Sequence, residues 1–191
     1  MPRLALLLLL PLCLLAACGE EQEPAPRVFD VKAPRGERRA EFPTAGMALD
    51  RPRNWKLRRR DPPGVFELLS GEAIVAGWAY ERDEPLPETD AQLEAARDRL
   101  LEAIAARDPD YRVLSAETTE VAGSPAIDVT GEQVVSRRRL RTRSVHVFEG
   151  DVEYVIEAIA PPRDHRLVDT RVLEPLLGSL ELEGEVLEGA G

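Results

Sequence analysis

The sequence predicts an α+β domain in which an antiparallel β-sheet is flanked by two helices. Short strand-like segments follow one another, and Gly, Pro and acidic residues mark the turns between them. One long amphipathic segment interrupts this series, and a second helical segment lies near the end of the chain. Four consecutive strands between the two helices favour an antiparallel meander, because parallel neighbours need long crossover connections.

The first strands begin near residue 43. Residues 47–50 and 55–58 form two strand-like pieces. The runs 65–69 and 73–80 lie on either side of Ser70-Gly71-Glu72, which is typical of a hairpin.

The best helix covers residues 89–108. Thr89 and Gln92 have the spacing of a capping box, and Asp108-Pro109 ends the segment. Its apolar residues recur at helical spacing and form one stripe: Leu93, Ala96, Leu100, Leu101 and Ile104. Such a stripe packs on the core of its own domain or binds a partner.

Four strands are predicted after this helix. They cover residues 111–121, 126–135, 141–148 and 152–160. The last of them alternates apolar residues with Glu153 and Glu157, as a strand does when only one of its faces is buried.

The end of the chain contains a second predicted helix over residues 166–177. Pro175 is expected to kink or shorten it, because proline lacks the N–H of a helical hydrogen bond. A short strand at 179–182 and a frayed tail over 184–191 complete the prediction.

The N-terminus predicts export and lipidation. Residues 1–17 contain Arg3, a leucine-rich run and small residues, the features of a signal peptide. The end of this segment, Leu15-Ala16-Ala17-Cys18, resembles the bacterial lipoprotein signal. That resemblance implies cleavage before Cys18 and a diacylglycerol on its sulfur, with a fatty acid such as palmitate as the membrane anchor. An ordinary secretory leader that happens to contain a cysteine is the alternative.

A membrane-spanning helix does not fit this segment. The apolar run 4–15 spans only about 18 Å as a helix, which is shorter than the roughly 30 Å hydrocarbon core.

The predicted domain organisation follows from these segments. Residues 18–42 are polar, charged and rich in proline, which predicts a flexible tether after the lipidated cysteine. The folded domain is expected over 43–183. Its two candidate thiols, Cys13 and Cys18, lie outside it, so thiolate metal sites and disulfides are excluded there. The net charge of −10 disfavours nucleic acid as a partner.

Several short motifs resemble the family of the photosystem protein PsbP, the Ran-binding protein Mog and uncharacterised bacterial lipoproteins. They are Pro52-Arg53-Asn54-Trp55, Val121-Ala122-Gly123-Ser124-Pro125-Ala126, the strand–turn–strand at 145–156, and Leu176-Leu177-Gly178-Ser179-Leu180. Leu180 stands where the family usually has an aromatic residue. The resemblance covers about 43–182 and implies an α/β/α sandwich that acts as a binding or assembly module.

No catalytic motif is found. The two histidines, His146 and His165, lack any recognisable metal-ligand spacing. Nucleophile elbows, phosphate loops and dinucleotide fingerprints are absent. We therefore expect no catalytic residue, no metal and no cofactor.

Arginines provide one candidate binding feature. Arg137, Arg139, Arg141 and Arg143 lie at period two, so a continuous strand would place four guanidinium groups on one face. Such a face would suit phosphates or carboxylates of an anionic ligand. The alternative is a hairpin whose arginines are solvated, since a turn within 136–140 breaks the alternation.

The functional prediction combines these features. We expect a non-enzymatic protein that is held at the outer side of the cell membrane by diacylglyceryl-Cys18. Its partner would be an envelope protein or a small anionic or amphipathic ligand. An envelope hydrolase that uses paired carboxylates as acid and base is the alternative.

Overall fold

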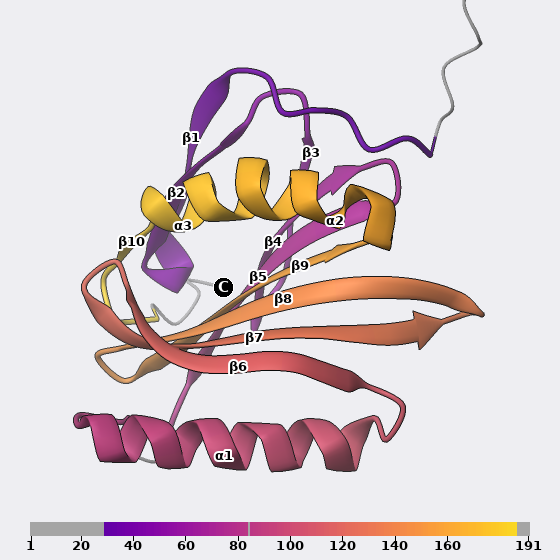
Figure 1. The fold of residues 1–191 in the computed structure, drawn as a ribbon. Helices are drawn as coiled ribbons and strands as arrows, with labels where there is room; N and C mark the ends of the chain where they lie inside the picture. Colours follow the sequence, from indigo (N-terminus) through magenta and orange to yellow (C-terminus); the bar gives the residue numbers. More distant parts are fainter. Residues whose placement is uncertain (1–28, 84, 187–191) are drawn as a thin grey trace, which may run out of the picture.

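The computed structural model describes residues 29–83 and 85–186 and confirms the α+β class (Figure 1). The strands are β1 (Glu37–Phe42), β2 (Met47–Pro52), β3 (Lys56–Arg59), β4 (Gly64–Ser70), β5 (Ala73–Glu81), β6 (Arg112–Val121), β7 (Ser124–Val135), β8 (Arg138–Glu149), β9 (Val152–Ala160) and β10 (Glu181–Leu182). The helices are η1 (Pro43–Ala45), α1 (Asp90–Arg107), α2 (Pro162–Val168), the π-helical turn η2 (Asp169–Leu173) and α3 (Glu174–Gly178).

Seven strands form one antiparallel sheet in the order β3-β4-β5-β9-β8-β7-β6. The hairpins predicted around Gly71 and Gly150 are confirmed, and both glycines have the positive φ that their turns require. β9 is the central strand, so its two faces lie in the middle of the two sides of the sheet. The remaining strands, β1, β2 and β10, form a second sheet of three.

The two sides of the large sheet are covered differently (Figure 1). The continuous helical segment α2–η2–α3 and the small sheet pack on one side, where they enclose the larger hydrophobic core. Helix α1 lies on the opposite side and contacts β6 and β7. This arrangement has the helix–sheet–helix order that the motifs imply.

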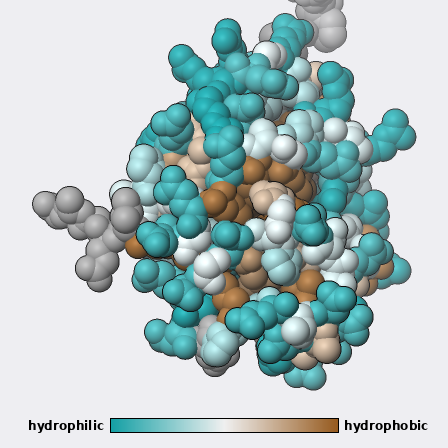
Figure 2. Space-filling model, turned by 90° about the vertical axis from the view of Figure 1, so that its left-hand side faces the viewer, coloured by the Kyte–Doolittle hydropathy of each residue, from teal (hydrophilic) through white to brown (hydrophobic). Residues whose placement is uncertain are grey.

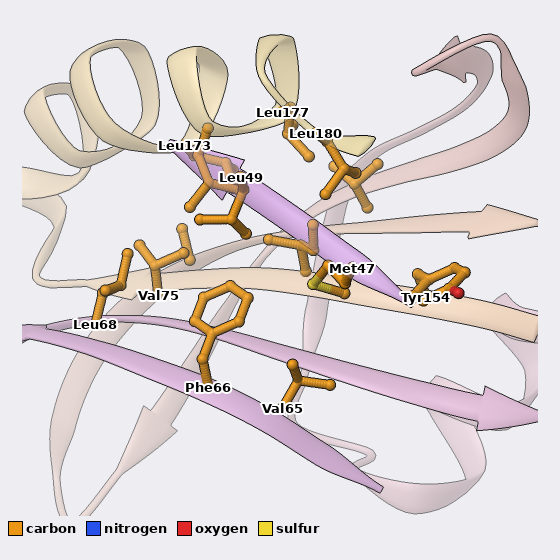
Figure 3. Packing of buried hydrophobic residues seen from close by; sticks show 14 of the residues in the cluster. Met47, Leu49, Val65, Phe66, Leu68, Val75, Tyr154, Leu173, Leu177 and Leu180 are labelled. Carbon is orange, nitrogen blue, oxygen red and sulfur yellow. The ribbon is translucent and has the colours of Figure 1, made fainter. Parts of the chain in front are cut away.

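The larger core joins residues from distant parts of the chain (Figure 3). Leu173 and Leu177 point from the C-terminal helix toward Met47 and Leu49 of β2, with Phe66 of β4 beneath them. All five side chains are buried, and Leu49, Phe66 and Leu173 are fully so. On the outer surface, hydrophilic residues cover most of the side that Figure 2 shows, and hydrophobic residues gather in its middle.

Helix α1 has the predicted start and the predicted apolar stripe. Thr89 accepts a hydrogen bond from the Gln92 backbone N–H, and the Gln92 side chain accepts one from the Thr89 N–H, which completes the capping box. Leu93 and Ile104 are buried against Ile127 and Val129 of β7 in a smaller second core. Within the described residues, the stripe is therefore used for core packing.

The C-terminal helix is longer than predicted. It begins at Pro162, because proline at the first helical position loses no hydrogen bond. Pro175 does not end it, because the turn before this residue widens to the π form and the Glu174 N–H donates to Asp169 O. The π turn accommodates a residue that has no N–H of its own.

The predicted tether boundary is wrong. Residues 37–42 form β1, which pairs with the whole of β2. Before β1, the Trp55 indole N–H donates to Lys32 O at 3.0 Å, and the Asn54 amide bonds Arg35 N and Ala33 O. The sequence pattern does not indicate this strand, because it lies at a sheet edge and buries only Ala40 and Phe42. Its other residues are charged or partly exposed.

The predicted tail boundary is also wrong. Gly184 is buried, and its carbonyl accepts a hydrogen bond from Asp151 N, because the chain passes directly over the β8–β9 turn. Val186 packs against the larger core. The folded domain therefore extends from about residue 31 to 186. The predicted signal peptide (1–17), Cys18 and residues 187–191 lie outside the described residues.

We predict that a chain starting at residue 43 folds poorly. Removal of β1 deletes the buried side chains Ala40 and Phe42 and leaves β2 without a partner along one edge. The loss of one buried phenylalanine alone costs about 3–5 kcal/mol. Urea unfolding of chains 43–191 and 29–191 measures the difference. Equal free energies of unfolding would show that β1 contributes nothing.

Candidate functional site

A groove runs between α1 and the large sheet, and we name it the α1 groove. Two cavities of about 460 and 340 Å³ form it, and both are lined by Arg82, Leu100, Ala103 and Glu153. It exists because α1 is displaced toward the β6–β7 edge, which leaves β5, β9 and the adjoining part of β8 less covered on this side.

The floor of the α1 groove comes from the polar face of β9. Tyr154 and Ile156 point into the larger core, so the alternation of the strand turns Glu153, Val155 and Glu157 toward α1. The register with β8 places His146 directly opposite Val155. These residues therefore meet in the middle of the groove.

Glu153 is the most strongly bound charged group of the floor. Its side chain is only 8% exposed, and the His146 Nδ1 lies 2.7 Å from its Oε1. Arg82 forms an ion pair with its other oxygen. Burial alone would raise the pKa of Glu153, but the hydrogen bond and charge of His146, together with Arg82, lower it. Glu153 is thus held as a carboxylate.

Glu157 has the opposite electrostatic environment. Burial raises the pKa of Glu157, and the more distant charges of His146 and Arg107 offset this only in part. Glu153 and Glu157 lie four residues apart on one face, which is about 13 Å along the strand. Carboxyl pairs in glycoside hydrolases are separated by roughly 5–9.5 Å, so this spacing does not favour the paired-carboxylate alternative.

Aromatic residues form the walls. Trp78 and Tyr80 come from β5, and the Arg82 guanidinium lies 5.7 Å from the centre of the Tyr80 ring. Tyr111 lies at the end of the groove, where its hydroxyl is 2.6 Å from Thr142 Oγ1. Its ring lies across Gly131, where a Cβ atom would be only 2.4 Å from the ring. The glycine thus makes room for this wall.

The arginine face predicted on the sequence is not formed as a set of four. Ser136 and Arg137 both have positive φ and form the turn between β7 and β8, so Arg137 is not on the strand. Arg141 pairs with Glu132 at 2.8 Å, and Arg143 pairs with Asp128 and Asp169, each at 2.7 Å. Of these four arginines, Arg139 alone is both on β8 and exposed.

The ion pairs of Arg143 have a structural role. They connect β8 to β7 and to the π turn of the C-terminal helix, on the side opposite α1. The sequence shows charges of both signs but not which of them meet across the sheet. A groove between the sheet and one helix is expected for a ligand, but its lining residues were not predicted, for the same reason. The acids of β9 and the nearby His146 were visible only as a polar strand face.

Metal-binding groups and membrane-spanning helices were also sought in the structure. In the described part of the chain, no group of three or more His, Cys, Asp or Glu side chains is arranged to hold a metal ion. None of the helices in that part is long and apolar enough to cross a membrane.

Comparisons with known proteins identify the fold. No family model and no curated protein matches the sequence. Among solved structures, the chain is similar to cyanobacterial PsbP (CyanoP) from Synechocystis, with a TM-score of 0.59 and 11% identity over 88% of this chain and 98% of that one.

Two further structures are similar at a lower level. One is LpqN, a protein involved in cell envelope biogenesis of Mycobacterium tuberculosis, with a TM-score of 0.52 and 10% identity over 78% of this chain and 86% of that one. The other comes from Bacteroides thetaiotaomicron, with a TM-score of 0.52 and 11% identity over 77% and 49% of the two chains. At these identities the likeness establishes a PsbP-like fold.

We predict opposite effects of neutralising the two floor carboxylates. A carboxyl whose pKa is raised on folding destabilises the folded protein above its ordinary pKa of 4.5, so Glu157→Gln should raise the melting temperature at neutral pH. This gain should vanish in acid below that value, where both states are protonated. Thermal melting across pH measures the effect.

Glu153→Gln is the matched control. The pKa of Glu153 is lowered on folding, so its charge stabilises the protein above the ordinary pKa, and this contribution is lost as pH falls through the folded value. The melting temperature of Glu153→Gln should therefore fall at neutral pH. A lower melting temperature for Glu157→Gln at neutral pH would contradict a raised pKa of Glu157 in the folded protein.

Proposed function

We propose that this chain is a lipid-anchored extracytoplasmic protein and that its PsbP-like domain is a non-enzymatic binding module. The anchor is the diacylglyceryl group on Cys18, as the sequence Leu15-Ala16-Ala17-Cys18 indicates. The envelope role of LpqN, which has a similar fold, is compatible with this location. The binding site is the α1 groove, and this groove is the observation that supports a binding function.

The composition of the groove favours an amphipathic ligand. Leu100, Ala103 and Val155 offer apolar contacts, while His146 and Arg82 offer donors beside Glu153. Within the described residues His146 uses Nδ1 for Glu153, and no hydrogen bond involves its Nε2. An apolar body with one polar group that bonds His146 would satisfy both sets of contacts, as in most small-molecule sites. An envelope protein that inserts one side chain there is the alternative occupant.

The anchor is tested by replacing the cysteine. In a bacterial host, Cys18→Ser should abolish the incorporation of labelled palmitate and move the protein from the membrane fraction to the soluble extracytoplasmic fraction. The two acyl chains of a diacylglyceryl group give stable attachment, whereas a single acyl chain holds a protein only marginally. Cys13→Ser is the matched control and should keep both properties. Labelled, membrane-bound Cys18→Ser protein would exclude this anchor.

The groove is tested by filling it. Ala103 lines both cavities, so Ala103→Trp should occupy the space and weaken ligand binding by at least about tenfold, or about 1.4 kcal/mol. Native mass spectrometry of chain 19–191 with extract from its own envelope measures the bound mass. Ala105→Trp adds the same side chain to an exposed position of α1 outside the cavities and should leave binding unchanged.

Two outcomes would contradict the groove as the binding site. One is a ligand that remains bound to Ala103→Trp with unchanged affinity. The other is equal loss of binding in both tryptophan variants, which would point to a general effect of tryptophan on α1.

A further inference from the structure

A separate cavity lies on the side of the molecule opposite α1, and we name it the Arg51 cavity. Its volume is about 820 Å³, and it lies between the start of β1, the end of β2 and the π turn of the C-terminal helix. Three arginines line it: Arg35 just before β1, Arg51 and Arg171. Two acids, Glu37 and Asp50, line it as well.

Arg51 is a buried cation without an acidic partner among the described residues. The residue is only 9% exposed. Its Nη1 donates to the carbonyl oxygens of Pro52 and Trp55, each at 3.2 Å, which holds the guanidinium in place. Its Nε is buried and has no hydrogen-bond partner. A buried donor without an acceptor is unfavourable, so this group is suited to an added anion.

The neighbouring strand β1 places a second positive charge beside Arg51. Arg38 is directly opposite Arg51 in the β1–β2 register. Like charges at directly opposite positions destabilise a strand pair. Burial lowers the pKa of Arg51, and the charge of Arg38 lowers it further. Arg38 and Arg51 thus form a like-charge pair across the two strands, at a position where an acid opposite an arginine would stabilise the pairing.

The nearby acids belong to the other face of the small sheet. Side chains alternate along a strand, so Glu37 and Asp50 point away from the face that carries Arg38 and Arg51. Asp50 also lies 3.9 Å from Arg39. Both acids line the Arg51 cavity, but their side chains lie on the face of the small sheet opposite to that of Arg38 and Arg51.

The site is close to the point where the chain would leave for the membrane. Arg35 is only six residues after Phe29, the first described residue, and Figure 1 shows this start on the α2–α3 side, away from α1. Eleven peptide units connect Cys18 to Phe29, which span at most about 40 Å even when fully extended. An anchored chain would keep the Arg51 cavity near the lipid headgroups.

From these observations we propose that the Arg51 cavity binds the phosphate of an anionic lipid headgroup. Guanidinium groups bind phosphate through two parallel hydrogen bonds, and Arg51 has an unused N–H for this purpose. The choice of a headgroup over free phosphate rests on the proposed lipid anchor. Docking in this way would turn the α1 groove away from the membrane, since α1 lies on the opposite side (Figure 1).

The test uses chain 19–191, which contains every described residue but no lipidation site. We expect it to bind phosphatidylcholine vesicles that contain phosphatidylglycerol more tightly than vesicles of pure phosphatidylcholine, despite its net negative charge. Arg171→Gln should reduce this binding roughly fivefold, which corresponds to about 1 kcal/mol per arginine near an anionic surface. Cosedimentation with the vesicles measures the partition.

Arg166→Gln is the matched control, because Arg166 is exposed on the same helical segment, outside the cavity. It should bind like the unchanged chain, and equal loss in both variants would reduce the effect to net charge and overturn the proposal. Because Arg51→Gln alters a buried residue, Arg51 is followed in the unchanged chain through the NMR resonance of its Nε–H.

The source of the phosphate is decided by a second titration. Inorganic phosphate should shift the Arg51 Nε–H resonance in the unchanged chain. A shift with phosphate but equal binding to both kinds of vesicle would overturn the headgroup and identify free phosphate as the ligand. No shift and no vesicle preference would overturn the site itself. Neither result bears on the anchor, which the palmitate experiment on Cys18 tests separately.

Discussion

The alternation of side chains along β9 is the constraint on which the rest of the structure depends. This strand is the centre of the large sheet, so its two faces determine what both sides of the molecule can bury. Tyr154, Ile156 and Ala158 are completely buried in the larger core, whereas Glu153 and Glu157 face α1. A register shift by one residue would place both glutamates in the apolar core, which is very unfavourable.

The unequal covering of the two sheet faces then creates the candidate site. On one side, the C-terminal helix and the small sheet enclose an apolar core, and Arg143 holds the helix to β7 and β8 through its ion pairs with Asp128 and Asp169. On the other side, α1 buries its apolar stripe mainly on β6 and β7. The polar face of β9 is left under the edge of the helix, where it forms the floor of a groove.

The α1 groove and the Arg51 cavity lie on opposite sides of the large sheet and have different electrostatics. In the α1 groove, Glu153 is balanced by His146 and Arg82, so the floor offers both donors and acceptors to a ligand. In the Arg51 cavity, three arginines outnumber the two lining acids, and Arg51 also has Arg38 as its neighbour across two strands. This contrast is the physical basis for assigning an amphipathic ligand to the first and an anionic group to the second.

The sequence by itself determined the local structure: the capped helix α1, the hairpins, the half-polar strand β9 and the α+β class all follow from periodicity and turn residues. The motifs also indicated the PsbP-like fold, and the anchor at Cys18 stays a prediction from the sequence. Only the tertiary structure decided which charges meet. Arg141 and Arg143 have the spacing of a free face, yet acids from β7 and the C-terminal helix neutralise them. Edge strand β1 could not be predicted because its stability comes from pairing with β2, which no local pattern encodes. The same holds for the segment before it, which is bound to Asn54 and Trp55.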